Sequence, residues 1–382
     1  MLKEIPFFLH SMENDLLQKI PKIFENSNNL KTKELESKFI KFLNVDYLLT
    51  VINSSLALHL AMYALNIKRG DKIICSVNSF IDISNAIRHF DSVPLFVDSI
   101  ENGYSMDLDK LEKTIEQNRS KKLKAIVINH LSGDIIDLDR LYKIAKENNL
   151  RVIEDATYAM GTKYNGNLIG NIGADITIFG FSPHQSRTTI NGAIFVTNNK
   201  EMYQRAEIVK NSGINQDNWD RFSGIDYLYD VISLGWAYNM SEVDALFALS
   251  IMDNLESNIK RVKELTKRYN RNLKDIPYIK LPTIDNDKNQ IFSLYIIEVA
   301  TNRDLLAKEL KLRDIETSLH YPPLHLMTYY KKRYSFKIFD FPTALTQYQK
   351  MLSLPLYPSM SNEDVDIVSN AIKDIIYKKY SI

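Results

Sequence analysis

Predicted strands and helices alternate through the first half of the chain, and this alternation constrains the fold more than any other feature. Short apolar runs at 47–52 and 72–76 are each followed by an amphipathic helical pattern, at 56–65 and 81–89. The alternation continues with predicted strands at 94–98, 125–129 and 151–154 and predicted helices at 107–117 and 137–148. This order indicates an α/β fold with a parallel sheet covered by helices on both faces. Ligands in such sheets bind outside the carboxyl ends of the strands.

The C-terminal third of the chain has a different pattern. Two long helical patterns, at 241–255 and 258–273, lead to a predicted strand at 291–299 and a predicted helix at 303–312. We therefore expect a large domain over residues 1–257 and a small domain over residues 258–382. A chain of 382 residues is long enough to bury a large core.

The composition argues against several classes of partner and compartment. Lys and Arg number 48 against 47 Asp and Glu, so no overall field favours nucleic acid or an anionic membrane. No apolar run reaches the length of a membrane helix, and acids and a proline interrupt the N-terminal stretch where a signal peptide would be apolar. The single cysteine, Cys75, is typical of a reducing compartment. We expect a cytoplasmic protein.

Several stretches of the sequence, in order, resemble the DegT/DnrJ/EryC1/StrS family of sugar aminotransferases. Residues 70–80, GDKIICSVNSF, are similar to the family's GDEVIVPSFTF, and residues 153–176 to its EDAAQA segment. The polar loop in FGFSPHQSRTTING, between predicted strands at 176–181 and 193–196, is similar to FSFHPxKxxTTGEGG. HYPPLHLM and LPLYP are similar to C-terminal signatures of the family.

The resemblance implies a fold, a substrate class and an assembly. The fold is that of fold-type I aminotransferases, with a mostly parallel seven-stranded sheet in the large domain and a small C-terminal α+β domain. Members of the family act mainly on keto sugars attached to nucleotides, and they form homodimers with active sites at the interface. We therefore expect a nucleotide-linked sugar as the ligand and a second copy of the chain as the partner.

Gln185 stands where the family has its Schiff-base lysine. Pro183 on one side and Thr188 and Thr189 on the other match the family pattern and fix this register. A glutamine amide cannot condense with the aldehyde of pyridoxal phosphate (PLP), and it cannot carry a proton between two carbons. The resemblance therefore predicts a relative that cannot run ordinary transamination.

Other positions of the family's cofactor site are partly kept. Asp155 matches the aspartate that pairs with the pyridinium nitrogen, and Phe80 matches the aromatic residue that stacks on the ring. Tyr158 stands at a position that is commonly Gln or His. The structural alternatives are a helix cap or turn for Asp155 and a core position for Phe80.

The phosphate end of the site departs further from the family. Ser54 and Ser55 replace a Gly-Thr pair at a helix N-terminus, whose amides can still hold an anion or simply begin the helix. Gly180 replaces a phosphate-binding serine, and Ala237 replaces an asparagine that reaches across the dimer interface. Each lost contact costs about 1 to 3 kcal/mol. We expect PLP or pyridoxamine phosphate (PMP) to bind non-covalently and weakly, or not at all.

Three histidines are candidates for the remaining chemistry. His184 adjoins the lysine position and has an ordinary pKa of about 6.5, so it could serve as a base, as a histidine does in the family's sugar dehydratases. The alternative for His184 is a loop or interface residue. His320 and His325, in HYPPLH, are assigned to the substrate pocket or to inherited architecture.

Three functional readings follow from this pattern. The chain could be a dehydratase-like enzyme on a 4-keto sugar nucleotide, using PLP or PMP with His184 as the base. It could instead bind or convert a nucleotide sugar without the cofactor. The third reading is a pseudoenzyme that partners an active relative, and the state of the phosphate end separates it from the first.

Overall fold

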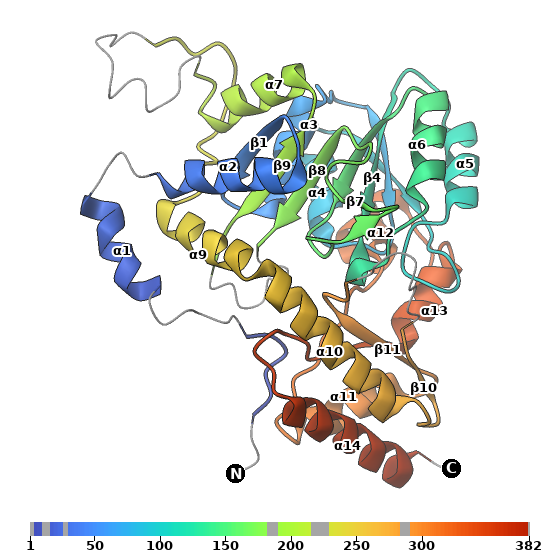
Figure 1. Ribbon diagram of the computed structural model, residues 1–382. Helices are drawn as coiled ribbons and strands as arrows, with labels where there is room; N and C mark the ends of the chain where they lie inside the picture. The colour runs from blue at the N-terminus through green and yellow to red at the C-terminus, as the bar shows by residue number, and fades with distance from the viewer. Residues whose placement is uncertain are drawn as a thin grey trace.

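The fold is described here from a computed structural model. It describes residues 4–9, 16–25, 30–181, 190–214, 229–282 and 291–380. Figure 1 shows a broad upper domain that contains the large sheet and a smaller lower domain near both termini, with the long helix α10 (Leu255–Leu273) running from one to the other.

A seven-stranded sheet forms the centre of the large domain. Its strand order is β1-β9-β8-β5-β4-β2-β3. The four pairs from β8 to β3 are parallel, and β9 is antiparallel to both of its neighbours. The strands are β1 (Tyr47–Val51), β2 (Lys72–Ser76), β3 (Val93–Val97), β4 (Leu123–Asn129), β5 (Arg151–Asp155), β8 (Ile176–Gly180) and β9 (Ala193–Thr197). Their almost continuous burial is typical of a sheet covered on both faces.

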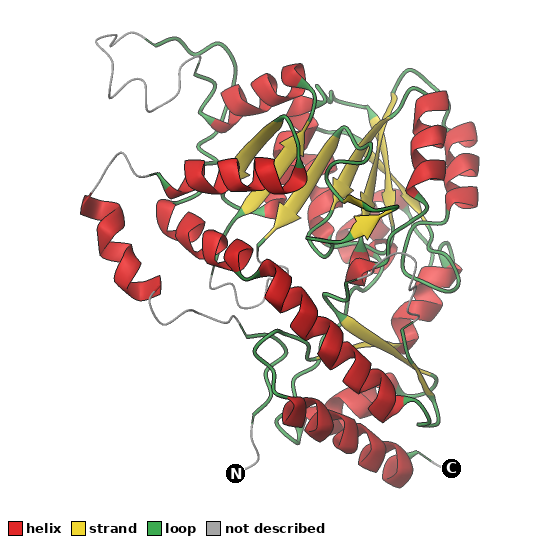
Figure 2. Ribbon diagram, viewed as in Figure 1, coloured by secondary structure: helices red, strands yellow, loops and turns green. Residues whose placement is uncertain are grey.

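Helices cover both faces of this sheet (Figure 2). One buried cluster joins a sheet face to α2 (Lys31–Leu43), α5 (Leu108–Gln117), α6 (Leu138–Glu147) and α9 (Glu242–Asp253). The other cluster joins the opposite face to α3 (Ser54–Ala64), α4 (Ile81–His89), α7 (Lys200–Lys210), α12 (Thr328–Tyr334) and α13 (Pro342–Lys350). The hairpin of β6 (Lys163–Tyr164) and β7 (Asn167–Leu168) packs on the first of these clusters through Tyr164 and Leu168, and the short helix α1 (Leu16–Glu25) contributes to neither cluster.

The small domain packs helices against a three-stranded antiparallel sheet of order β10-β11-β12. Its elements are β10 (Ile279–Lys280), β11 (Tyr295–Val299), α11 (Arg303–Lys311), β12 (Met351–Leu354) and α14 (Asn362–Lys379). The core cluster includes Tyr269 of α10, stacked on Tyr295 of β11, and Ile5 from the N-terminal segment. The expected boundary near residue 258 lies inside α10, and α12 and α13 pack on the large domain.

The predicted fold class is confirmed. The large domain has the mostly parallel seven-stranded sheet, and the C-terminal part of the chain forms the small α+β domain. None of the helices in the described ranges is both long and apolar enough to span a membrane.

Candidate functional site

The candidate site forms at one edge of the large sheet, where strands end and helices begin. Asp155 is the last residue of β5, and Phe80 caps the start of α4 shortly after β2. Ser54 and Ser55 open α3 after β1. Because β1, β2 and β5 run in the same direction, their carboxyl ends bring these four residues to one edge, as the crossover connections of an α/β sheet require.

Asp155 is held by the residues that follow it. Its Oδ1 accepts hydrogen bonds from the backbone N–H of Thr157 at 3.1 Å and from the Thr157 hydroxyl at 2.6 Å. Burial raises the pKa of the Asp155 carboxyl, and the nearby Asp82 carboxylate adds to this, whereas the Thr157 hydrogen bonds oppose it. Within the described part of the chain, Oδ2 accepts no hydrogen bond. A cationic N–H donor at Oδ2 would offset the cost of burying the charge.

Aromatic side chains form the wall beside Asp155. The ring of Phe80 lies 5.2 Å from the ring of Tyr321, and the hydroxyls of Tyr321 and Tyr158 are 2.6 Å apart. The backbone N–H of Tyr321 donates to Asn78 Oδ1 at 3.3 Å. Burial raises the pKa of both phenols, so both stay protonated at neutral pH. This end of the site offers flat apolar surface and two hydroxyls.

The start of α3 provides two backbone donors. The N-cap Asn53 side chain accepts from Leu56 N–H, and in the described part of the chain the amides of Ser54 and Ser55 make no hydrogen bond. Free amides at a helix N-terminus attract anions. The Ser55 hydroxyl, however, donates to the carboxylate of Asp82 on α4. The Ser55 hydroxyl is therefore not available to donate to a ligand. The Asp82 carboxylate also lies close to the amides of Ser54 and Ser55, and its negative charge opposes the binding of an anion there.

Gly180 closes the phosphate end against Thr157. A Cβ atom at Gly180 would lie 3.1 Å from Thr157 Oγ1 and 3.3 Å from Ser54 Cβ. Serine at this position would therefore crowd both neighbours, and the Thr157 hydroxyl at this point donates to Asp155. Ala237 is exposed and forms an isolated β-bridge with Asn211.

The ring end and the phosphate end of the candidate site differ in how well their residues match PLP. At the ring end, Asp155, Phe80 and Tyr158 match a protonated pyridine ring. At the phosphate end the described residues offer a dianion the amides of Ser54 and Ser55, but the Ser55 and Thr157 hydroxyls donate to carboxylates and Gly180 has no side chain.

The predicted histidines have separate locations. His320 is buried beside the aromatic wall, with its ring 6.2 Å from that of Tyr158, and Nδ1 hydrogen-bonds with Ser353 Oγ at 2.8 Å. Burial lowers the pKa of His320 to about 3, so it is neutral. His325 instead contacts Phe341, and its Nε2 donates to the Ile338 carbonyl at 3.1 Å. His184 and Gln185 lie outside the described residues.

Sequence reasoning missed three residues of this site. Thr157 departs from the alanine of the EDAAQA pattern, and this difference was a usable signal. Asp82 lies in the first turn of a helix that follows Phe80, where an acid is ordinarily assigned to the helix dipole. Tyr321 follows His320 in the HYPPLH stretch but joins the site through the tertiary contacts with Phe80 and Tyr158.

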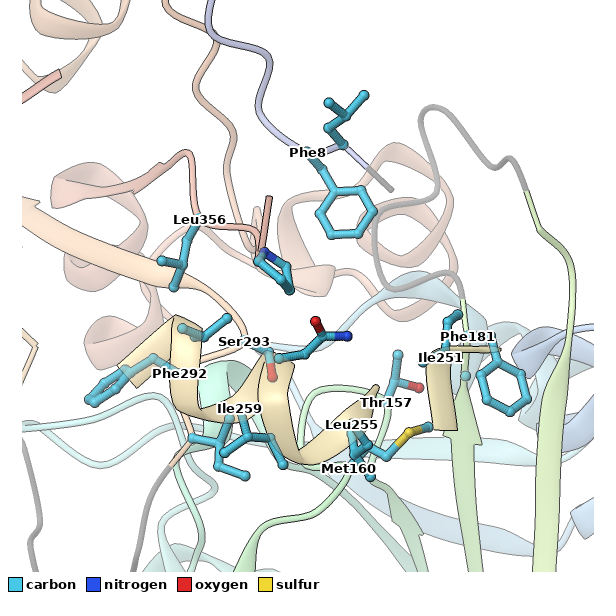
Figure 3. Close-up of a pocket in the computed structure, with 16 residues that line it drawn as sticks. Phe8, Thr157, Met160, Phe181, Ile251, Leu255, Ile259, Phe292, Ser293 and Leu356 are labelled. Carbon is cyan, nitrogen blue, oxygen red and sulfur yellow. The ribbon is translucent and has the colours of Figure 1, made fainter. Parts of the chain in front are cut away.

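An apolar cavity of about 190 Å³ adjoins the phosphate end (Figure 3). Thr157 and Gly180 form one wall, shared with the site. Side chains of α9, α10, the N-terminal segment and the small domain form the others, among them Phe8, Ile251, Leu255, Ile259, Phe292 and Leu356. In Figure 3, Thr157, Phe181 and Ile251 lie on the side opposite Phe292 and Leu356.

Curated relatives cover nearly the whole chain. The chain is 34% identical to the uncharacterized protein MJ1066 of Methanocaldococcus jannaschii, over 91% of this chain and 90% of the relative. It is 31% identical to the spore coat polysaccharide biosynthesis protein SpsC of Bacillus subtilis, over 97% of each. It is also 31% identical to GDP-perosamine synthase of Escherichia coli O157:H7, over 91% of this chain and 90% of that enzyme.

Solved structures agree with the fold. PseC of Helicobacter pylori, an aminotransferase involved in pseudoaminic acid biosynthesis, superposes with a TM-score of 0.85 at 20% identity, covering 97% of this chain and 98% of that chain. A DegT DnrJ EryC1 StrS aminotransferase from Brucella abortus gives a TM-score of 0.83 at 25% identity, covering 95% of each. The family profile itself matches residues 12–373. With the fold, the profile and the relatives in agreement, the chain belongs to the DegT/DnrJ/EryC1/StrS aminotransferase family.

Proposed function

We propose that this protein binds and converts a nucleotide-linked keto sugar in the synthesis of a surface polysaccharide, and that it does so without ordinary transamination. Two relatives named for polysaccharide or perosamine synthesis support the substrate class. The resemblance of the sequence around Gln185 to the family's lysine motif supports the loss of transamination.

The observation that carries this proposal is the contact of Thr157 with Gly180. Thr157 fills the space next to Gly180 and directs its hydroxyl to Asp155. In this proposal a phosphate-binding hydroxyl at residue 180 and the covalent lysine at residue 185 are both missing from one site. Such a combination supports weak, non-covalent binding of PLP or PMP, or none, because each lost contact costs about 1 to 3 kcal/mol.

His184 is the proposed base for a dehydratase-like reaction. It adjoins Gln185 in the sequence, and β8 ends four residues before it at Gly180. With an ordinary pKa of about 6.5, a histidine there can accept a proton at neutral pH. His184→Ala should then abolish turnover while leaving sugar-nucleotide binding intact. Unchanged turnover in this variant would remove His184 from the mechanism.

The direct test is incubation of the protein with a 4-keto sugar nucleotide. With L-glutamate and PLP present, we expect no amino sugar, and mass spectrometry should detect loss of water from the sugar. Formation of an amino sugar at a rate typical of the family would contradict the proposal. The aminotransferase PseC of Helicobacter pylori is the positive control.

We also propose a homodimer, formed in part by the segment around residues 229–236. Leu234 is 85% exposed and Trp236 is 54% exposed, and Val231 and Ile232 are also exposed. A large contiguous group of exposed apolar side chains is typical of a protein interface. The segment adjoins a cavity that also contains Ser55 and Asp82, so a partner seated there would lie next to the candidate site.

The same apolar surface supports the second candidate function. A pseudoenzyme needs a protein surface but not a cofactor site, and the poor phosphate end is compatible with that role. In this case the partner is an active relative of the same fold. Binding of a nucleotide sugar without any turnover, together with association with an active relative, would favour this second candidate.

A further inference from the structure

We infer that the apolar cavity next to Thr157 and Gly180 receives an acylamino substituent of the sugar, so that the preferred substrate is an N-acylated amino sugar nucleotide. This inference rests on the proposed function, because it names the substrate class of the same site. The residues expected to bind the cofactor, Asp155, Phe80, Ser54 and Ser55, do not line this cavity.

The lining of the cavity excludes charged groups. No charged side chain lines it among the described residues, and its walls are mostly aliphatic or aromatic. A nucleotide diphosphate would lose its hydration there without gaining a cation, so the phosphates must lie elsewhere. An uncharged group with an apolar end gains from burial against Leu255, Ile259 and Leu356.

The polar groups in the lining are matched to an amide. The side chain of Asn258 makes no hydrogen bond in the described part of the chain, so its carboxamide offers two N–H donors and a carbonyl acceptor. The hydroxyls of Thr157 and Ser293 already donate, to Asp155 Oδ1 and to the Tyr158 carbonyl at 2.6 Å each, and so can only accept from a ligand. The cavity therefore offers two hydroxyl oxygens that can accept a hydrogen bond, and one carboxamide, that of Asn258, that can both donate and accept. An acylamino group supplies the complementary N–H donor and C=O acceptor, and its alkyl end faces the apolar wall.

The position of the cavity supports a substituent rather than a separate ligand. Thr157 and Gly180 line the cavity and also form the phosphate end of the candidate site. A sugar at the sheet edge thus has direct access to it. The volume of about 190 Å³ accommodates a short acyl chain with its amide and leaves room for a larger one.

Calorimetry with two nucleotide sugars tests this inference. UDP-N-acetylglucosamine and UDP-glucose differ only in the acylamino group, and we expect the first to bind about tenfold more tightly, from one methyl and one amide hydrogen bond. Asn258→Leu should bring the two dissociation constants within about threefold. Leu255→Phe, which reduces the cavity, should weaken only the acylated ligand. Lys260→Ala, on the exposed side of the same helix, should keep the tenfold preference.

The outcomes separate this inference from the proposed function. Equal binding of both sugars to the unaltered protein would overturn the inference and leave sugar-nucleotide binding intact. A preference that Asn258→Leu and Leu255→Phe both leave unchanged would also overturn it, because the acyl group would then lie elsewhere. Absence of binding for both sugars would contradict the proposed function and this inference together. Thermal unfolding of each variant checks that the fold is retained.

Discussion

The hydroxyl of Thr157 lies 3.1 Å from the point where a Cβ atom on Gly180 would stand, and it donates to Asp155 at 2.6 Å. One side chain thus links two changes from the family pattern. The family motif that the sequence resembles has an alanine two residues after the aspartate and a serine five residues before the lysine, where this chain has Thr157 and Gly180. Because interiors are close-packed, a larger residue at one position favours a smaller one at the other.

This contact predicts that the two positions are energetically coupled. Gly180→Ser should destabilise the protein more when Thr157 is present than in Thr157→Ala, with a coupling energy of about 1 kcal/mol. Urea unfolding of the two single variants and the double variant forms the cycle. Additive free energies of unfolding would show that the contact imposes no constraint.

The two buried phenols should also behave as a pair. Tyr158→Phe leaves the Tyr321 hydroxyl without its 2.6 Å partner, and we expect a loss of about 1 to 3 kcal/mol in the free energy of unfolding. Because the second change then removes an unsatisfied hydroxyl, Tyr158→Phe with Tyr321→Phe should cost less than the sum of the single changes. A double variant that loses the full sum would contradict this pairing.

His320 predicts a specific pH dependence. Burial lowers its pKa in the folded protein to about 3 from the ordinary 6.5, so the unfolded chain binds the extra proton first as pH falls. The stability from neutral His320 is present above pH 6.5 and is lost as pH falls from 6.5 toward about 3. Between pH 7 and pH 5 this contribution falls by about 2 kcal/mol.

His320→Gln isolates this contribution from that of the carboxylates. The variant should be less stable at pH 7, because the ring packs on Phe7 and bonds to Ser353. Its stability should nevertheless fall less between pH 7 and pH 5 than that of the unaltered protein, as measured by urea unfolding. The same pH slope in both proteins would show that His320 does not titrate as described.

The exposed apolar segment predicts the assembly. Leu234→Asp should convert a dimer into a monomer at micromolar concentration, because a charge at a desolvated interface weakens binding by two orders of magnitude or more, about 3 kcal/mol. Leu312→Asp, at an equally apolar and 69% exposed position in the small domain, is the matched control and should leave the mass unchanged. A monomeric mass for the unaltered protein by light scattering would rule out the dimer.

The sequence predicted the fold well because its signals are local. Strand and helix patterns such as 72–76 with 81–89 depend on neighbouring residues, and the structure has β2 and α4 at these positions. The antiparallel placement of β9 beside β1 is a long-range pairing, and no local pattern specified it.

The candidate site was predicted only in part, for the same reason. Asp155, Phe80, Ser54 and Ser55 could be found because each lies next to a strand end. The bonds from Ser55 to Asp82 and from Tyr158 to Tyr321 join residues that are distant in the chain, so they required the tertiary structure. The cavity of Asn258 and Leu255 likewise depends on where α10 packs.

Titration with PLP, and separately with PMP, tests the central claim most directly. We predict that neither form is retained through dialysis, that PLP gives no absorbance change of covalent attachment at the site, and that any calorimetric binding is micromolar or weaker and is reduced by Asp155→Asn. Thr157→Ala combined with Gly180→Ser and Gln185→Lys should strengthen PLP binding by at least about a hundredfold, since it restores a hydroxyl and a lysine. Tight, dialysis-resistant PLP on the unaltered protein, with unchanged affinity in the triple variant, would contradict the account.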